Sequence, residues 1–351
     1  MTPATSLQKR YRFSLSLSAV FDTREDDAVF RSEGVEGYVP FQKEKENEPL
    51  KLGAILPLVQ SLLKHFPEYF DFVFVSRAHP AVKKRLMLSL KEYGLYDQKQ
   101  SRPMIDRAIF TNGKSVLPAL KMYRADHVIT SRSPEAQNDA IAALRAGIAA
   151  DCVSATPPQR QGHIDHPCLA FDLDGVAFNR DSEDVFQRNI QREMRASKEQ
   201  LRPFKIDHAV RPYSRHEARK MFVPLPAGSH LRLMQHVHGI NALGGKKIDL
   251  VVNTARGGDP QERAVRSLEH YGITEYGMYP TPHGVTKADV AAHVDPVPHL
   301  FSEDTGKNVA LTEAIIATGH VLSEAAQEAQ AAATHPKRRP RRAAAPADPK
   351  R

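Results

Sequence analysis

An internal repeat limits the folds open to this 351-residue chain more than any other feature of its sequence. The segment "PLKLGAILPLVQ" at 49–60 matches "PLPAGSHLRLMQ" at 224–235. After each match comes a continuous apolar run that ends at a hydroxyl residue, Ser76 in the first copy and Thr254 in the second. A chain that repeats its own pattern in this way is expected to build two related halves.

Two further pairs of segments match in the same order along the chain: 89–95 with 267–273, and 126–132 with 298–304. The first pair reads "SLKEYGL" and "SLEHYGI", and the glycine in each is well placed to end a helix. The second pair reads "DHVITSR" and "PHLFSED", and each segment is expected to lead into an alanine-rich helix. These two helices are predicted to end at Gly147 and Gly319.

The apolar runs "FDFVFVSRA" and "IDLVVNTAR" are continuous and rich in β-branched and aromatic residues, which is typical of buried parallel strands. They alternate with helix-period segments, so the sequence predicts an α/β protein with parallel sheets flanked by helices on both faces. Ligands bind at the carboxyl ends of the strands in such sheets. The polar residues at those ends are therefore the candidates for a functional site.

Six polar residues of the second copy fall at strand ends or in the loops beyond them: Asp172, Asp174, Thr254, Lys287, Glu303 and Asp304. An Asp-x-Asp pair alone is more often a turn or a helix cap than a catalytic site. The order of all six residues along the chain is a much more specific signal than any one of them.

This set of residues resembles the four motifs of the haloacid dehalogenase superfamily of phosphatases. The span from about Phe13 to Gly319 resembles the cytosolic 5'-nucleotidase type I family, on the stretches "EGVEGYVPFQKEKENEPLKLG", "FDLDGVAF" and "TARG". Two details depart from the superfamily pattern. Its last motif is usually a double aspartate, whereas this chain has Glu303 and Asp304, and Thr254 occupies the Ser/Thr position in an "NTAR" context.

The resemblance implies a duplicated Rossmann-like fold of the haloacid dehalogenase type, with a small, mostly helical cap in the second half. We expect a degenerate half at 1–155, which serves as a scaffold or regulatory unit, and a catalytic half at 156–325. The cap is expected at about 183–222, a segment rich in arginine and lysine that would suit an anionic ligand. A solvated helical face is the alternative for this segment.

The resemblance also implies roles for the site residues. Asp172 would be the nucleophile that forms an aspartyl-phosphate, and Asp174 would protonate the leaving oxygen and then activate water. The backbone amides of residues 173–175, Leu173, Asp174 and Gly175, would bind phosphate oxygens. Thr254 would donate a hydrogen bond to the phosphoryl group, and Lys287 would neutralise its charge.

Closely packed carboxylates need a cation among them, and oxygen ligands without cysteine or histidine at ligand spacing favour Mg²⁺ over zinc. We expect Mg²⁺ on Asp172, the carbonyl of Asp174, and Asp304, with Glu303 as a ligand or as a neighbour of the ligands. His236 and His238 are two residues apart on a predicted helix and point to different faces, so they are interpreted as core or surface residues.

The first copy keeps an aspartate, Asp22, in a blurred version of the motif, "LSAVFDTRED". Arg24 stands where the proton donor is expected, and Ser131 and Arg132 replace the acidic pair. Two guanidinium groups, those of Arg24 and Arg132, are therefore expected in place of the metal, where they could balance the charge of Asp22. This half is predicted not to hydrolyse phosphate and to serve as a scaffold, an interface or an anion-binding regulatory site.

Composition limits the partners of the chain. Its formal charge is +8, but the segment 337–351 holds seven Lys or Arg residues and one Asp. The rest of the chain therefore carries only about +2, and the tail at 326–351 is expected to be disordered, with no specific nucleic-acid partner. No run of about 18 apolar residues and no signal-peptide pattern occurs, which favours a cytoplasmic protein without membrane contact. Cys152 and Cys168 lack Cys-x-x-Cys spacing and are interpreted as small buried residues.

The function predicted from these observations is Mg²⁺-dependent hydrolysis of nucleoside 5'-monophosphates, and the resemblance hints at a homo-oligomer. One alternative is a phosphatase of the same superfamily that acts on sugar phosphates or other small metabolites. Another is a non-catalytic protein that binds nucleotides or nucleic acid. The residues alone indicate a magnesium-dependent phosphomonoesterase and do not choose the base or the sugar.

Overall fold

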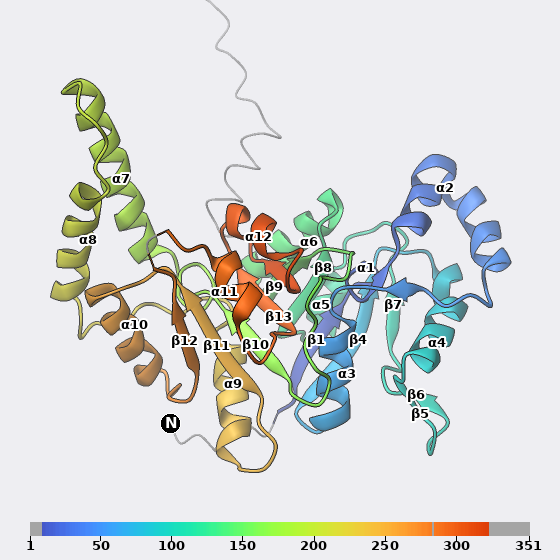
Figure 1. The fold of residues 1–351 in the computed structure, drawn as a ribbon. Coiled ribbons are helices and arrows are strands. Elements are labelled where there is room, and N and C mark those ends of the chain that lie inside the picture. The colour runs from blue at the N-terminus through green and yellow to red at the C-terminus, as the bar shows by residue number, and fades with distance from the viewer. Residues whose placement is uncertain (1–8, 283, 323–351) are drawn as a thin grey trace, which may run out of the picture.

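A ten-stranded sheet forms the centre of the computed structural model, which describes residues 9–282 and 284–322 (Figure 1). From one edge to the other, its strands are β12 (Gly277–Pro280), β11 (Asp249–Thr254), β10 (Cys168–Phe171), β13 (Leu300–Glu303), β14 (Thr318–His320), β9 (Ala149–Val153), β8 (His127–Ser131), β1 (Tyr11–Leu15), β4 (Phe70–Ser76) and β7 (Ala108–Phe110). Within the described residues, every neighbouring pair in this sheet is parallel except β14 with β9. The predicted α/β class is confirmed.

The sheet divides at the antiparallel β14–β9 pair, which we call the seam, into two sets of strands with the same order. Numbered along the chain within each set, both read 3-2-1-4-5 from the outer edge to the seam. Sequence analysis predicted parallel sheets in two halves, whereas the structure joins all the strands into one sheet. The seam is short: Gly319 pairs with Val153, and His320 pairs with Cys152.

Helices cover both faces of this sheet. Along the first set of strands they are α1 (Leu17–Val20), α2 (Arg24–Glu44), α3 (Leu56–His65), a 3₁₀ turn (Pro80–Val82), α4 (Lys83–Glu92), α5 (Leu117–Met122) and α6 (Pro134–Arg145). Along the second set they are α9 (Leu231–Ala242), α10 (Asp259–His270), α11 (Lys287–His293) and α12 (Gly306–Thr312), while α7 (Asp181–Glu199) and α8 (Asp207–Arg219) extend away from the sheet. Residues of α3, α4, α9 and α10 share one apolar cluster, whereas α5 and α6 belong to a second and α11 to a third.

The alternation of side chains along a strand explains this layering. In β10, Leu169 and Phe171 belong to the cluster formed with α9 and α10, whereas Cys168 and Ala170 belong to the cluster formed with α11. Strands buried on both faces read as continuous apolar runs, which is the pattern seen in the sequence. Cys152 and Cys168 are buried and free, as predicted.

The glycines predicted to end helices behave in two ways. Gly94, Gly147 and Gly272 follow α4, α6 and α10 with φ values of +70°, +76° and +77°, a conformation that favours glycine. The prediction for Gly319 is wrong, because α12 ends at Thr312 and Gly319 lies within β14. A side chain at this position would overlap the carboxylate of Asp151 on β9, so the glycine is required by strand packing.

Helices α7 and α8 form a hairpin that projects from one end of the sheet (Figure 1). The hairpin contains most of the segment 183–222, which is therefore mostly helical, as predicted. Helix α8 packs against α10, and Glu217 of α8 forms ion pairs with Arg256 and Arg263. The hairpin is thus connected to the second set of strands at its base.

Two small antiparallel pairs lie outside the main sheet: β2 (Phe21–Asp22) with β3 (Lys51–Leu52), and β5 (Tyr96–Asp97) with β6 (Arg102–Pro103). No helix in 9–282 or 284–322 is long and apolar enough to cross a membrane. The tail predicted to be disordered, 326–351, lies outside the described residues.

Candidate active site

The candidate catalytic residues meet at the carboxyl ends of three adjacent strands. Asp172 directly follows β10, Glu303 ends β13 and Thr254 ends β11, while Lys287 is the first residue of α11. Parallel neighbours end at the same edge of a sheet, and a tight turn must follow Asp172 to keep the chain there. Gly175 makes this turn with φ of +76°, and a side chain in its place would overlap the Asp304 carboxylate.

Lys287 lies between two carboxylates in the interior of the site. Its Nζ donates to Asp172 Oδ2 at 2.7 Å and to Glu303 Oε2 at 2.7 Å, and all three side chains are buried. Burial raises the pKa of Asp172 well above its ordinary value, although the Lys287 ammonium opposes this shift. Burial lowers the pKa of Lys287, but the two carboxylates more than offset this and raise it. Lys287 is therefore charged and holds both acids.

Asp304 completes the acidic group and is paired with a residue that sequence analysis missed. Arg180, next to the N-terminus of α7, forms an ion pair with Asp304 Oδ2. Burial raises the pKa of Asp304 to about 6, while the Arg180 guanidinium opposes this shift. Arg180 follows the quoted "FDLDGVAF" motif by two residues, but one arginine in a loop carries no distinctive sequence signal.

Asp174 is also held by an arginine that was assigned no role. Arg256 donates from Nε to Asp174 Oδ2 at 2.8 Å and from Nη2 to Asp174 Oδ1 at 2.5 Å. Its Nη1 donates to Glu217 Oε2 of α8 at 2.9 Å. Burial lowers the pKa of Arg256, but the Asp174 carboxylate more than offsets this and raises it. Arg256 thus connects the expected acid–base residue to the helical hairpin.

Thr254 is buried at the same edge of the sheet, where its hydroxyl accepts a hydrogen bond from the Arg256 backbone amide at 3.2 Å. The Leu173 amide donates to Asp172 Oδ1 at 2.8 Å, so one of the three amides expected to bind phosphate contacts the expected nucleophile. His236 is buried within α9, where Nε2 contacts the Tyr69 carbonyl, and His238 contacts Thr274. These two histidines therefore lie apart from the site, as interpreted from their spacing.

The carboxylates of Asp172, Glu303 and Asp304 can each offer one oxygen, and these oxygens all lie within 4.8 Å of one another. A set of carboxylate oxygens without nitrogen or sulfur suits a hard divalent cation such as Mg²⁺. Burial away from water is the main cause of the raised pKa values of Asp172 and Asp304, and repulsion by the neighbouring carboxylates adds to it. The residues present therefore fit a Mg²⁺ ion.

A cavity of about 310 Å³ lies beside this site. Gly175, Asn179 and Arg180 line one part of it, and Leu144 and Val321 line another. Leu144 belongs to α6 of the first set of strands, whereas Gly175 follows β10 of the second set. Both sides of the seam therefore contribute to the wall of this cavity.

The matching edge of the first set of strands corrects the residue correspondence drawn from the sequence. The Asp172 amide donates to the Ser302 carbonyl of β13 at 2.9 Å, and the Ser16 amide donates to the Ile129 carbonyl of β8 at 3.0 Å. Ser16 thus occupies, after β1, the position that Asp172 occupies after β10. Asp22 lies six residues further on, so its assignment as the counterpart of Asp172 is wrong.

The strand register extends this correction. Leu15 pairs with Ile129 as Phe171 pairs with Ser302, so the places of Glu303 and Asp304 are taken by Thr130 and Ser131. The earlier match was displaced by one residue because the short segments share no distinctive letters apart from a histidine. In this register, "SLS" at 16–18 corresponds to "DLD" at 172–174, and Ser76 corresponds to Thr254.

The two arginines expected to replace the metal in the first copy behave differently from each other. Arg24 contacts Asp22 through two hydrogen bonds of 2.8 and 2.6 Å at the surface. Arg132 instead pairs with Glu313 at 2.5 Å and donates to the Cys152 carbonyl. The expectation that both guanidinium groups balance Asp22 is therefore wrong for Arg132.

Comparison with known proteins agrees with this geometry. A family model described as 5'-nucleotidase matches residues 3–328. The chain belongs to the 5'-nucleotidase family. Human cytosolic 5'-nucleotidase 1B is 29% identical to it over 180 residues, which make up 48% of this chain and 28% of that protein. The matched segment is therefore little more than a quarter of the relative. No solved structure matches this 5'-nucleotidase family member.

Proposed function

We propose that this protein is a Mg²⁺-dependent 5'-nucleotidase that converts nucleoside 5'-monophosphates to nucleosides and phosphate. The observation that carries the proposal is the buried group of Asp172, Lys287, Glu303 and Asp304 at the carboxyl ends of β10 and β13. Membership of the 5'-nucleotidase family supports the choice of substrate class. The predicted resemblance to haloacid dehalogenase-like phosphatases supports the choice of mechanism.

In the first step, a carboxylate oxygen of Asp172 bonds to phosphorus while the bond from phosphorus to the 5'-oxygen breaks. Asp174 supplies the proton that the departing oxygen needs. In the second step, Asp174 takes a proton from water as the water oxygen attacks phosphorus. The bond from phosphorus to the Asp172 oxygen breaks, which frees inorganic phosphate and restores the Asp172 carboxylate. Asp174 must leave the Arg256 guanidinium, or move with it, to reach the substrate.

The charge of the phosphoryl group is balanced by residues around the nucleophile. Lys287 already contacts Asp172 and lies where it can also neutralise a phosphoryl oxygen. The Thr254 hydroxyl and the amides of residues 173–175 would donate hydrogen bonds to the remaining oxygens. A Mg²⁺ ion on Asp172, Asp304, the Asp174 carbonyl and Glu303 would supply further electrostatic stabilisation of the phosphoryl charge.

The remainder of the molecule has a role in this proposal. The α7–α8 hairpin acts as a cap that excludes water. Arg256 pairs with both Glu217 of α8 and Asp174, so a movement of the hairpin would also move Asp174. The cavity beside Gly175 and Arg180 takes the nucleoside, since its volume of about 310 Å³ is in the range of small-molecule pockets. We also propose that the chain is duplicated, with residues 1–155 as the non-catalytic half and 156–325 as the catalytic half, and the repeated strand order supports this proposal. We further propose a cytoplasmic homo-oligomer, as the family resemblance implies.

The decisive experiment measures phosphate release from nucleoside 5'-monophosphates and sugar phosphates, with Mg²⁺ or with a chelator, for the native protein and for Asp172→Asn. The proposal expects Mg²⁺-dependent release from nucleotides that disappears in the variant. Release from sugar phosphates alone would keep the mechanism and reject the substrate class. No release from any ester, with the native protein folded, would favour a non-catalytic nucleotide-binding protein.

A further inference from the structure

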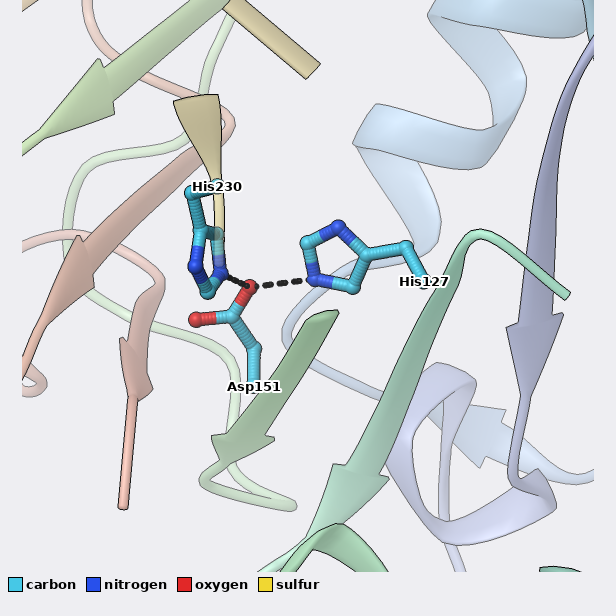
Figure 2. A group of neighbouring side chains, drawn as sticks. All are labelled: His127, Asp151 and His230. Atoms are coloured by element: carbon cyan, nitrogen blue, oxygen red, sulfur yellow. Dashed lines mark hydrogen bonds and ion pairs between the residues drawn. The ribbon is translucent and has the colours of Figure 1, made fainter. Parts of the chain in front are cut away.

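A second group of buried titratable residues lies away from the candidate active site and has no part in the mechanism above. His127 of β8, Asp151 of β9 and His230, the residue before α9, have no solvent exposure (Figure 2). His127 Nε2 lies 2.7 Å from Asp151 Oδ2, and His230 Nε2 lies 3.0 Å from the same oxygen. Two imidazoles and one carboxylate thus converge from three elements on one point in the core.

The surroundings of these three residues make their presence costly. The cluster is embedded among aromatic and aliphatic side chains, with Phe13 against the His127 ring and Phe171 against the His230 ring. Burying a charged or polar group in such a place requires full compensation. Asp151 lacks it: Oδ2 is contacted by both histidines and by the Ser302 hydroxyl, whereas Oδ1 has no hydrogen-bond partner among the described residues.

The outer nitrogens of both histidines also have partners. His230 Nδ1 lies 2.9 Å from the Ser229 hydroxyl, and His127 Nδ1 lies 3.5 Å from the Tyr11 hydroxyl. Histidines that bind metal through one nitrogen usually donate from the other, which fixes the ring and leaves the first lone pair free. Without a metal ion, each Nε2–H donates to Asp151 Oδ2. With zinc bound, that hydrogen would instead be on Nδ1, next to Ser229 or Tyr11, and the Nε2 lone pairs would face the ion.

We propose that His127, Asp151 and His230 form a structural zinc site that joins the two sides of the seam. The ligand atoms lie within 4.8 Å of one another, and two imidazole nitrogens with one carboxylate suit zinc better than Mg²⁺. Ligands of a tetrahedral zinc ion stand about 3.3 Å apart. The Nε2 atoms of His127 and His230 lie 2.7 and 3.0 Å from Asp151 Oδ2, so they would move away from that oxygen by about 0.6 and 0.3 Å. Ser302 or Asp151 Oδ1 can complete the coordination.

The position of the site explains its use. His127 and Asp151 lie in strands of the first set, whereas Ser302 lies in β13 of the second set and His230 precedes α9, which packs on that second set. The β-ladder at the seam has only two residue pairs, so a metal ion here would add a connection where the sheet has few. Because the residues are fully buried, the ion would enter during folding and exchange slowly. This proposal does not depend on the proposed catalytic activity.

The test measures metal content by mass spectrometry after the full-length protein has been unfolded and refolded with zinc, then dialysed against a chelator. About one zinc ion per chain is expected in the native protein and in Asp172→Asn, which leaves this cluster intact. His127→Gln and His230→Gln should lose the zinc. His236→Gln is the matched control, since His236 is a buried histidine that also contacts Tyr11 but lies outside the cluster.

Refolding with cobalt keeps the test decisive if the histidine variants fail to fold. The native protein should then show the visible absorption of four-coordinate cobalt, and added zinc should remove it. Native protein that binds neither metal after refolding would overturn the proposal. The three residues would then be only a buried hydrogen-bonded cluster without a metal ion. Zinc content that is unchanged in His127→Gln and His230→Gln would overturn it as well.

Discussion

The two sides of the sheet place different chemistry at matching positions. After β10 the chain carries Asp172 and Asp174, whereas after β1 the corresponding residues are Ser16 and Ser18. The serine hydroxyls contact each other at 3.3 Å and need no cation. The aspartates instead need cationic partners: Lys287 pairs with Asp172, and Arg256 pairs with Asp174. Their acidic neighbour Asp304 pairs with Arg180. One strand order thus supports a highly charged site at one end and a neutral one at the other.

The difference lies in the residues after the strands, because the two sides share one strand order. Thr130 and Ser131 replace Glu303 and Asp304 while the strand pairing around them is the same in kind. Buried carboxylates are costly and remain only where they are paired, so their retention on one side points to chemistry rather than to folding. The predictions below test this contrast between the two sides.

The largest effect is expected at Asp172, the proposed nucleophile. Asp172→Asn should lower phosphate release at least about 10⁴-fold, because the amide cannot form the aspartyl-phosphate. Ser16→Ala and Asp22→Asn, the two first-side controls, should stay within about twofold of the native rate, since neither residue is expected to contact substrate. Rates are compared at saturating Mg²⁺ after circular dichroism has shown that each variant is folded. If either control lost as much activity as Asp172→Asn, the proposal that only the second side of the sheet is catalytic would be contradicted.

The next effect is expected at the buried lysine. Lys287→Met should reduce kcat by about 10²- to 10³-fold, because a positive charge is lost beside the phosphoryl group. It should also destabilise the protein by about 3–5 kcal/mol, since Asp172 and Glu303 lose their shared partner. Urea denaturation and steady-state kinetics measure the two effects. Lys51→Met, an exposed lysine near Asp22, is the control and should change neither quantity. A Lys287→Met variant with native activity and native stability would contradict the proposed role of Lys287 in the site.

A smaller effect separates the two arginine–aspartate pairs. Arg256→Met should lower the free energy of unfolding by about 3 kcal/mol, because Asp174 and Glu217 would both lose a buried partner. Arg24→Met should leave the unfolding midpoint nearly unchanged, because solvent screens the Arg24 guanidinium, whose side chain is 66% exposed. Thermal or urea unfolding of both variants checks this. Equal stability losses would mean that burial does not distinguish the two pairs.

The smallest effect concerns pH and Asp304. Its folded-state pKa of about 6 exceeds the ordinary value of 3.8, so the protonated form is favoured by folding. The resulting stability is fully present below about pH 4 and is lost as pH rises through 6. Without metal, the native protein should therefore lose on the order of 2 kcal/mol relative to Asp304→Asn between pH 4 and pH 7. Mg²⁺ should reduce this loss at pH 7. If the free energy of unfolding changed with pH in the same way in the two proteins, the raised pKa of the buried Asp304 would be contradicted.

Much of the second side could be predicted from sequence because its strands are long apolar runs that end at distinctive residues. Asp172, Glu303, Asp304 and Lys287 were identified in this way, and the structure brings all four together. Arg180 and Arg256 were missed, because their partners Asp304 and Asp174 lie far away in the chain. Long-range pairing of this kind leaves no local pattern to detect.

The first side was harder to interpret, because the serines of "SLSLSAVF" carry no charge and look like any exposed strand pattern. Asp22 attracted the assignment only because it is acidic. The hydrogen bonds of Ser16 and Asp172 to neighbouring strands decided the register, and such bonds cannot be read from single letters. For the same reason, the convergence of His127, Asp151 and His230 was not predicted, since the three come from separate elements.

The antiparallel seam also determines what happens when the chain is divided into two fragments. Separating the chain near residue 155 would leave β14 of one fragment and β9 of the other as unpaired edges, each next to a buried apolar core. Unpaired edges recruit other strands, so each fragment alone should aggregate. The two pieces should stay in solution only when they are produced together, which makes fragment complementation a practical way to exchange one side of this protein while keeping the other.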